Sequence, residues 1–440
     1  MVGITKMKAE KQKAEKEAFF CTTKELSRLG REQIPTQFQS HKHLIYSSPA
    51  TLAFNSPGAE GFGVKRAGLA VPDSIMLIVA PGCCGRNTSL ISSMKEYNDR
   101  FYYLMMDETD IVTGRHLKKI PKAVEEICSV CPKKPSVVMI CITCVDALLG
   151  TDMERVCKKA EEQVEIPVRP CYMYALTREG RKPPMVHVRQ SLYSLLEPGK
   201  KKGNVVNLLG FFSPLVDDCE IYDLLHSAGV KTIHEISRCK DYMEYQTMSE
   251  ANFNLVLHHE ARFAAEDFHN RLQIPFIELR RLYQIDKIEN QYHALGNALG
   301  VAFYDEKYKK QAEDALEKFR KKCPDASFAI GECLNADPFE LSLALIRYGF
   351  SVPEIYGTIT VENFTYIRSL AKISPETKVF SNMEPTMIYY DPAKSGVNLA
   401  IGKDACYYHP DCPYVMWNGE EQPYGYAGVR RLFEQLLEVV

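Results

Sequence analysis

Two runs, residues 74–80 and 136–141, in which an initial serine is followed only by apolar residues, constrain the fold of this chain most strongly. Apolar residues at every position are typical of parallel strands that are covered on both faces. Each run leads into a loop with cysteines, Pro81-Gly82-Cys83-Cys84-Gly85 after the first and Cys141-Ile142-Thr143-Cys144 at the end of the second. Because ligands of such sheets bind at the carboxyl ends of the strands, we expect these thiols to face a cofactor and not a disulfide partner.

The composition describes a globular chain without a surface for nucleic acid or membrane. Its 440 residues, 45% of them hydrophobic, can bury a large core and fill two or three domains. The net charge of -2 gives no broad basic face. No apolar stretch reaches the roughly 18 residues that span a bilayer, and the N-terminus lacks the apolar core of a signal peptide. We therefore expect a cytoplasmic protein whose 15 cysteines are reduced thiols or metal ligands.

Repeated units of a β-branched run, a polar loop and a helical segment divide the chain. Residues 1–35 include a stretch rich in Lys, Glu and Ala, which predicts a mobile N-terminal arm. A polar hinge at residues 197–204 separates a first domain (36–200), which carries both cysteine loops, from a second domain (201–322) and a third (323–440). The sequence therefore predicts an α/β fold of three doubly wound parallel-sheet, Rossmann-like domains.

Four cysteines also fit the spacing of a zinc ribbon, namely Cys128, Cys131, Cys141 and Cys144. The apolar strand between the two pairs, at roughly 3.3 Å per residue, holds them on the order of 20 Å apart. Tetrahedral zinc needs its sulfurs within a few ångströms of one another. We favour an arrangement in which Cys84 and Cys144, at the ends of two neighbouring strands, bind one iron–sulfur cluster. Cysteines that only pack in the core are the alternative.

Three motifs follow one another in the first predicted domain: Pro81-Gly82-Cys83-Cys84-Gly85, residues 107–114 (DETDIVTG) and residues 143–152 (TCVDALLGTD). In order and spacing they resemble the first domain of the nitrogenase component 1 family. Residues 254–256 and 273–276 (NLV and QIPF) resemble its second domain. The family includes the large subunits of nitrogenase, their cofactor-assembly scaffolds and the subunits of protochlorophyllide and chlorophyllide reductases. The resemblance covers most of the chain and implies three α/β domains of the nitrogenase component 1 type.

The resemblance implies that two related subunits hold an iron–sulfur cluster between them, with cysteines from both sides. Cys84 and Cys144 match the second and third cluster cysteines of the family, and we take both as metal ligands. The first would fall near residue 55, where this chain has none. Either the partner supplies an extra ligand, or Cys83 or Cys141 substitutes, or the cluster is smaller than that of nitrogenase. We expect a [4Fe-4S] or larger cluster at the subunit interface.

A second metallocofactor is a separate question. In the catalytic subunit of nitrogenase a cysteine of the second domain and a histidine of the third hold the cofactor, whereas the matching stretches here are residues 258–262 (HHEAR) and 422–428 (QPYGYAG). Neither ligand is kept, which argues against dinitrogen reduction on the usual cofactor. His258 and His259 follow a strand and are candidates for metal binding or proton donation. Satisfied structural histidines are the alternative.

The chain has no G-x-x-x-x-G-K-[ST] loop and therefore no recognisable ATP site. The resemblance implies that low-potential electrons come from a separate ATP-hydrolysing iron protein, and that a homologous component 1 subunit completes a heterotetramer or a homodimeric equivalent. We expect an iron–sulfur oxidoreductase subunit that relays electrons to a substrate or metallocofactor under anaerobic conditions. The alternatives are a cofactor-assembly scaffold without turnover of its own and a metal-free structural or regulatory homologue. The sequence does not identify a substrate.

Overall fold

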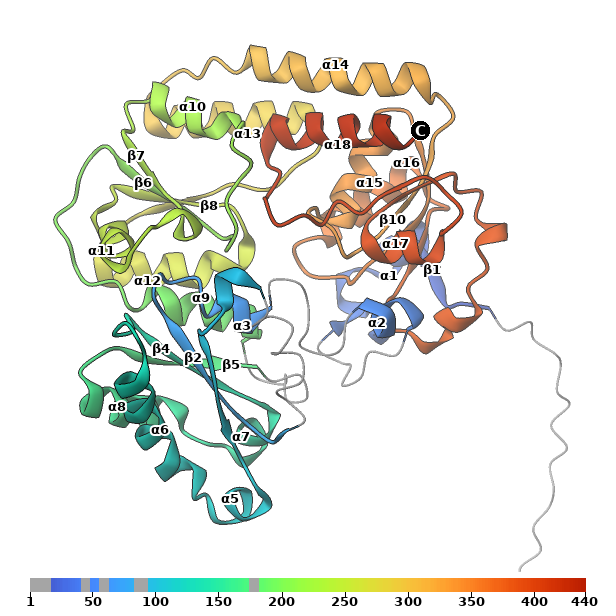
Figure 1. The fold of residues 1–440 in the computed structure, drawn as a ribbon. Coiled ribbons are helices and arrows are strands. Elements are labelled where there is room, and N and C mark those ends of the chain that lie inside the picture. Colours follow the sequence, from blue (N-terminus) through green and yellow to red (C-terminus); the bar gives the residue numbers. More distant parts are fainter. Residues whose placement is uncertain (1–16, 41–47, 55–62, 83–93, 174–181) are drawn as a thin grey trace, which may run out of the picture.

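The computed structural model describes residues 17–40, 48–54, 63–82, 94–173 and 182–440. These residues form three α/β units, each built on its own sheet (Figure 1). The architecture confirms the expected fold class. Within the described part of the chain, no helix is both long and apolar enough to cross a membrane.

The first unit carries the loop of Cys144 on a parallel sheet with the strand order β3-β2-β4-β5. Side chains of β2 alternate between two cores: Met76 and Ile78 face a core shared with the second unit, and Leu77 and Val79 face a core of the first unit alone. Both faces are covered, which explains the unbroken apolar run. The strands are β2 (Ile75–Ala80), β3 (Phe101–Met105), β4 (Val138–Ile142) and β5 (Val168–Tyr172), and the helices are α3 (Val64–Ala67), α5 (Glu108–Thr113), α6 (His116–Val130), α7 (Cys144–Leu149), α8 (Met153–Val164) and α9 (Pro184–Tyr193).

The second unit is a parallel sheet with the order β7-β6-β8-β9. Asn207 and Asn254 face each other on adjacent strands, and Asn207 Nδ2 donates to Asn254 Oδ1 at 2.7 Å. This bond offsets part of the cost of burying the two amides, because Asn207 Oδ1 and Asn254 Nδ2 have no partner among the described residues. The strands are β6 (Val205–Leu209), β7 (Thr232–His234), β8 (Phe253–Val256) and β9 (Phe276–Glu278), and the helices are α10 (Glu220–Ser227), α11 (Tyr242–Gln246), α12 (Arg262–Leu272), α13 (Ile285–Leu299) and α14 (Glu306–Lys322).

The third unit has a six-stranded sheet with the order β1-β12-β11-β10-β13-β14. Its edge strand β1 comes from the N-terminal part of the chain and pairs antiparallel with β12, whereas the other pairs are parallel. The strands are β1 (Phe20–Thr22), β10 (Ser327–Ile330), β11 (Ser351–Tyr356), β12 (Lys378–Phe380), β13 (Leu399–Ile401) and β14 (Tyr414–Val415), and the helices are α1 (Thr23–Leu29), α2 (Pro49–Phe54), α15 (Pro338–Arg347), α16 (Phe364–Ile373), α17 (Lys403–Tyr408) and α18 (Gly425–Val439).

The described residues before position 55 pack on the third unit (Figure 1). This placement differs from the prediction of an N-terminal arm over residues 1–35 and of a first domain that starts at residue 36. The physical reason is apolar burial, since Leu26 and Phe38 are fully enclosed in a core with residues of the third unit. The polar composition that suggested an arm lies almost entirely within residues 1–16, outside the described residues.

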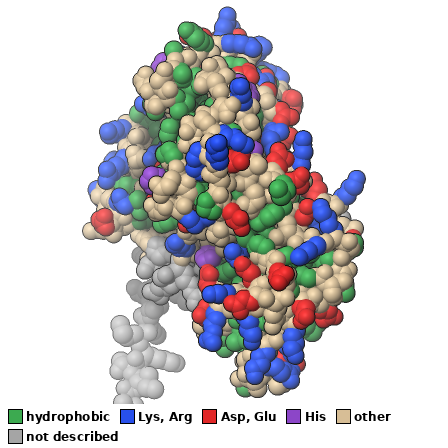
Figure 2. All heavy atoms as spheres, turned by 90° about the vertical axis from the view of Figure 1, so that its left-hand side faces the viewer, with side chains coloured by type: hydrophobic (Ala, Val, Ile, Leu, Met, Phe, Trp, Pro, Cys, Tyr) green, Lys and Arg blue, Asp and Glu red, His purple; other side chains and the backbone are tan. Residues whose placement is uncertain are grey.

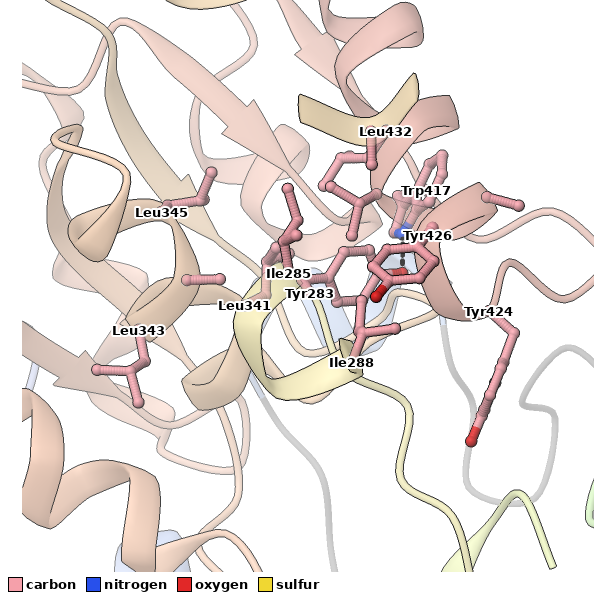
Figure 3. Packing of buried hydrophobic residues seen from close by; sticks show 14 of the residues in the cluster. Tyr283, Ile285, Ile288, Leu341, Leu343, Leu345, Trp417, Tyr424, Tyr426 and Leu432 are labelled. Carbon is pink, nitrogen blue, oxygen red and sulfur yellow. Dashed lines mark hydrogen bonds between the residues drawn. The ribbon is translucent and has the colours of Figure 1, made fainter. Parts of the chain in front are cut away.

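Two hydrophobic cores cross the boundaries between the units. One runs through the second and third units and includes Leu208 and Phe328, and Figure 3 shows a part of it. The other joins Met139 of the first unit to Phe268 of the second. Helix α14 also packs along α18 (Figure 1). The three units are therefore held together by buried apolar surface as well as by their linkers.

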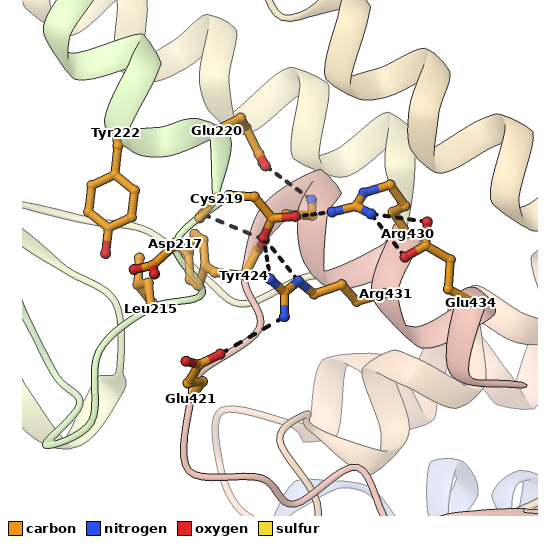
Figure 4. A network of polar contacts seen from close by, with 12 residues as sticks. Leu215, Asp217, Cys219, Glu220, Tyr222, Glu421, Tyr424, Arg430, Arg431 and Glu434 are labelled. Atoms are coloured by element: carbon orange, nitrogen blue, oxygen red, sulfur yellow. Dashed lines mark hydrogen bonds and ion pairs between the residues drawn. The ribbon is translucent and has the colours of Figure 1, made fainter. Parts of the chain in front are cut away.

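A buried carboxylate joins the second and third units at the N-terminus of α18 (Figure 4). Glu220, the first residue of α10 and 1% exposed, accepts hydrogen bonds from the backbone N–H groups of Tyr426 at 2.6 Å and Ala427 at 3.0 Å. The hydroxyl of Tyr292 donates to the same carboxylate at 2.6 Å. The first N–H groups of a helix have no partner within it and favour a negative charge. Glu220, which belongs to another unit, supplies both the hydrogen-bond acceptor and the negative charge.

Replacing Gly425 should break this contact. Gly425 has a φ of +57°, and an added Cβ would lie 1.9 Å from Glu220 Oε1 and 2.2 Å from the Tyr292 hydroxyl. We expect Gly425→Ala to lower the free energy of unfolding by roughly 2–4 kcal/mol, because it adds left-handed strain to overpacking at a buried charge. Urea unfolding followed by circular dichroism measures the change.

The matched control is Gly203→Ala, at an exposed site where an added Cβ meets no atom within 4 Å. Its free energy of unfolding should stay within about 0.5 kcal/mol of the original chain. If the two variants unfold at the same urea concentration, Gly425 does not have the role assigned to it.

Candidate cluster loop and interdomain junction

Cys144 lies where the sequence predicted, just beyond the carboxyl end of β4. It is the first residue of α7 and is half-buried. Helix α7 ends at Gly150, whose φ of +66° is a left-handed conformation that glycine adopts without strain. The thiol is thus held on a short, capped helix at the edge of the sheet.

Cys83 and Cys84 lie outside the described residues, so their pairing with Cys144 stays a prediction. The strand that precedes them is described, and Val79 of β2 is in register with Ile142 of β4. Strands β2 and β4 therefore end at the same edge of the sheet. Cys84 follows the end of β2 by four residues, which can span at most about 14 Å.

Cys141 has a different setting from Cys144. It lies within β4, fully buried in the core shared by the first and second units. Its register partner on β5 is Cys171, and a hydrogen bond between the two thiols lowers the pKa of Cys141. In this arrangement Cys141 packs inside the protein, on the face of the sheet and not at its edge.

A buried histidine–aspartate pair holds the Cys144 loop. His116 Nε2 lies 2.9 Å from Asp146 Oδ1, and the two side chains are 1% and 0% exposed. His116 Nδ1 lies 3.1 Å from the carbonyl oxygen of Asp110, and the hydroxyl of Thr151 donates to Asp146 Oδ1 at 3.0 Å. A carbonyl only accepts, so Nδ1 carries a proton, and a second proton must lie between Nε2 and Oδ1. The pair therefore couples the start of α6 to α7.

The motif at residues 107–114 also supports the Cys144 loop, through the contact of Asp110 with His116. Asp107 and Asp110 form a capping box at the start of α5. The buried carboxylate of Asp110 accepts hydrogen bonds from Lys119 Nζ at 2.6 Å and Arg115 Nε at 2.8 Å, and these bonds hold its pKa well below the usual range. The carbonyl of Asp110 then fixes His116, so two motifs of the sequence meet through one histidine.

Two buried polar atoms beside Cys144 have no hydrogen-bond partner within the described part of the chain, Thr143 Oγ1 and Asp146 Oδ2. Buried polar atoms ordinarily have partners, so the loop has hydrogen-bonding capacity to spare. A half-buried thiol with a neighbouring hydroxyl donor fits one corner of an iron–sulfur cluster. Among the described residues, however, no group of three or more His, Cys, Asp or Glu side chains could hold a metal ion.

Large apolar side chains are exposed near this edge of the sheet. Met105 ends β3, Val112 lies on α5, and Leu148 and Leu149 lie on α7, with exposures between 49% and 85%. Figure 1 places α5 and α7 toward the same end of the first unit. Exposed apolar side chains gathered near one edge are typical of a protein–protein contact. Elsewhere the charges are mixed, as Figure 2 shows for one face of the molecule.

His258 and His259 lie beyond the carboxyl end of β8, where the second unit faces the third. Their rings stack with centroids 4.5 Å apart. The backbone N–H of Glu260 donates to His258 Nδ1 at 3.3 Å, which leaves the proton of the neutral ring on Nε2. Burial, with the nearby charges of Arg189, His259 and Arg281, lowers the pKa of His258 well below its usual value. A neutral His258 with one free N–H is the result.

We call the surroundings of these histidines the interdomain junction, formed by the carboxyl ends of β6, β8 and β9 together with residues 420–424 of the third unit. Gly210 lets β6 end against β8, since an added Cβ would lie 2.8 Å from the backbone nitrogen of His258. Arg281, three residues beyond β9, donates to Gln422 Oε1 at 2.6 Å. The junction therefore combines two imidazoles with a guanidinium, and 33% of the His258 side chain is open to solvent.

The sequence did not indicate His116 or Arg281 as site residues. The pair Arg280 and Arg281, which follows residues 274–279 (IPFIEL) and thus the strand β9, is a local signal that points to Arg281. His116 has no such signal, because its partner Asp146 lies on a separate helix.

Comparison with known proteins identifies the family of this chain. Residues 60–440 match the family model described as nitrogenase component 1 type oxidoreductase. The nitrogenase iron-molybdenum cofactor biosynthesis protein NifE of Sinorhizobium fredii is 25% identical over 418 residues, 89% of this chain and 82% of that protein. For the protein of the same name from Nostoc, a 25% identical match covers 60% of this chain and only 57% of that protein.

A solved structure titled "Nitrogenase Cp1 at pH 6.5" has the same fold. It matches with a TM-score of 0.70 at 19% identity, over 90% of this chain and 93% of that one. Because the family model spans most of the sequence, this chain belongs to the nitrogenase component 1 type oxidoreductase family.

Proposed function

We propose that this chain is a subunit of a nitrogenase-like two-component reductase. In this proposal Cys144 and Cys84 bind an iron–sulfur cluster at a face shared with a homologous subunit. Electrons arrive from an ATP-hydrolysing iron protein and leave toward a substrate or metallocofactor at the interdomain junction. Membership of the nitrogenase component 1 family supports the assignment as an oxidoreductase subunit. The assignment of the cluster ligands depends on the burial and the contacts of the Cys144 loop.

The observation that carries the proposal is the construction of the Cys144 loop. A half-buried thiol, a spare hydroxyl on Thr143 and exposed leucines on the same helix are what a shared cluster requires. A cysteine that only packs in the core, as Cys141 does, would be enclosed and would need no support. The support here is the buried pair of His116 and Asp146.

Each group of the loop then has a definite role. When bound, an iron–sulfur cluster accepts and donates single electrons at a potential set by ligands, burial and hydrogen bonds to its sulfurs. Cys144 provides one thiolate. Thr143, the preceding residue, has a buried hydroxyl without a partner among the described residues, and His116 and Asp146 hold α7 in place.

At the junction, His258 and His259 are the groups that face a reacting molecule. A neutral His258 offers Nε2–H as a hydrogen-bond or proton donor, and its ring is held by Gly210 and by the N–H of Glu260. Proton delivery must accompany electron delivery when a substrate is reduced. In this proposal electrons are delivered at the sheet of the first unit and protons at the sheet of the second.

A second candidate function is a cofactor-assembly scaffold, which binds a cluster precursor without turning over a substrate. The curated relatives reported above favour it, because both are named as cofactor biosynthesis proteins. The same cluster loop and the same partner would serve either role. The two proposals differ in what becomes of the electrons.

We expect Cys144→Ser to remove most of the iron and the visible iron–sulfur absorbance of protein purified anaerobically, and Cys84→Ser to do the same, because a cluster that loses a thiolate is poorly held. Cys323→Ser is the control, since Cys323 follows the last turn of α14 in another unit. Iron assays on the three variants decide the matter. Equal iron contents would refute the ligand assignment.

His116→Gln should weaken the cluster without removing a ligand. It leaves Asp146 with Thr151 as its remaining side-chain partner, so the loop loses its main support. Loss of outer-shell support typically costs about 10–100-fold in metal affinity. Iron release to a chelator measures the change, and it should be at least tenfold faster than in the original protein.

His226→Gln is the matched control for that experiment. His226 also makes one ring hydrogen bond, to the carbonyl of Val230, but it lies in the second unit. Its iron should leave at the original rate. An unchanged rate in His116→Gln would mean that the buried pair serves only the fold.

Reconstitution with the reductase partner separates relay from scaffold. A relay subunit should consume electrons only when a substrate is added, with ATP hydrolysis by the partner. A scaffold should show partner-dependent ATP hydrolysis without substrate-dependent electron consumption, and should transfer its cluster to a metal-free acceptor protein. Colourless, iron-free protein from an anaerobic preparation would contradict both.

A further inference from the structure

Arg281 is a charged residue without a counterion among the described residues. Its guanidinium lies over the ring of Phe211, with Cζ 4.3 Å from the ring centroid, and it donates from Nη2 to Gln422 at 2.6 Å. Nε is buried and has no hydrogen-bond partner among the described residues. The side chain as a whole is partly exposed, so a small molecule can reach it.

No carboxylate of the described residues forms an ion pair with Arg281. The titratable groups that act on it are the phenols of Tyr283 and Tyr424, and burial lowers its pKa. A guanidinium keeps its charge under all ordinary conditions. A partly desolvated positive charge without a counterion is costly, and proteins usually pair such charges.

Other arginines of the same chain show how the fold meets this need. Arg189, also at the junction, donates to Glu260 at 2.8 Å and to the carbonyl of Gly210. Arg100 has no carboxylate either, but its guanidinium donates to the carbonyls of Ser74 and Leu69. Among the described residues, Arg281 has neither a carboxylate nor a backbone carbonyl as a hydrogen-bond partner. Its missing partner is the feature that requires an explanation.

We infer that Arg281 binds the carboxylate of a small organic acid at the interdomain junction. The inference rests on the proposed function, since it names the chemical class of the molecule that the junction receives. A planar guanidinium matches a carboxylate in shape and hydrogen-bonding geometry. Phe211 and the stacked rings of His258 and His259 provide flat apolar surface for the carbon part of such a molecule.

Charge matching selects a carboxylate over a phosphate. Arg189 forms an ion pair with Glu260, and His258 is neutral, so of these three groups only Arg281 has a positive charge without a carboxylate partner among the described residues. One carboxylate balances that charge, whereas a phosphate dianion would leave a negative charge partly buried. His258 Nε2–H can add one hydrogen bond to the bound acid.

The only tryptophan of the chain offers a direct readout. Trp417 is 7% exposed, and its indole N–H donates to the hydroxyl of Tyr283 at 2.6 Å, two residues from Arg281 (Figure 3). Acetate and succinate should change the Trp417 emission of the full-length chain saturably, at constant ionic strength. Chloride should not, and phosphate should act more weakly than either acid.

Arg281→Gln should reduce the apparent affinity for acetate and succinate at least tenfold. Arg280→Gln, which removes the exposed neighbouring charge, should leave it unchanged. Without added acid, Arg281→Gln should unfold at the same or a higher temperature than the original chain, because it removes an uncompensated charge. With acid present, only the chain with Arg281 should gain thermal stability. Arg281→Lys keeps the charge and should respond weakly.

Three results would overturn the inference: no saturable response to either acid in the original chain, an equal response in Arg281→Gln, or a stronger response to phosphate. A fall in the unfolding temperature of Arg281→Gln without acid would show that the arginine is structural. The iron content of the same preparations tests the cluster separately. If Cys144→Ser keeps its iron while the acid response holds, the cluster assignment fails and this inference stands.

Discussion

The contact of Glu220 with the first turn of α18 is the interaction on which the interdomain junction depends. Burial raises the pKa of this carboxyl, and three hydrogen-bond donors offset that cost. Because α18 begins three residues after Gln422, fixing its first turn also fixes Gln422 against Arg281. The contact therefore ties the start of α18 in the third unit to α10 in the second.

The ion pairs of Asp218 with Arg430 and Arg431 flank this contact (Figure 4). They are partly exposed, so each contributes only about 0–1 kcal/mol. The buried carboxylate, and not these pairs, sets the position of the helix.

The first two sheets use the same geometric rule for different chemistry. In each, the central strands run parallel and end together, so that loops from distant parts of the sequence converge. The first sheet has Cys144 there, and the second has His258 and Arg281. The positions of Cys144 and His258 could be predicted because an unbroken apolar run and the polar loop after it are local features, whereas the position of Arg281 was not predicted.

Other parts of the structure depend on contacts that local patterns do not encode. The pairing of β1 with β12 joins segments about 360 residues apart through three residue pairs, too few for a periodic signal. His116 meets Asp146 only because α6 and α7 converge. The burial of Cys141 was accessible in principle, since residues 139 and 141 of one strand share a face, and that face packs against the second unit.

The sheet of the third unit has a consequence for how the chain is made. Its edge strand β1 pairs with β12, so that Phe20 and its partner Phe380 are about 360 residues apart in the sequence. Domains form as units during synthesis, N-terminal ones first. Here β1 must wait, with its apolar side chains unpaired, until β12 has been translated. Residues 17–40 are therefore exposed for longer during synthesis than a segment that pairs with its neighbours in the sequence.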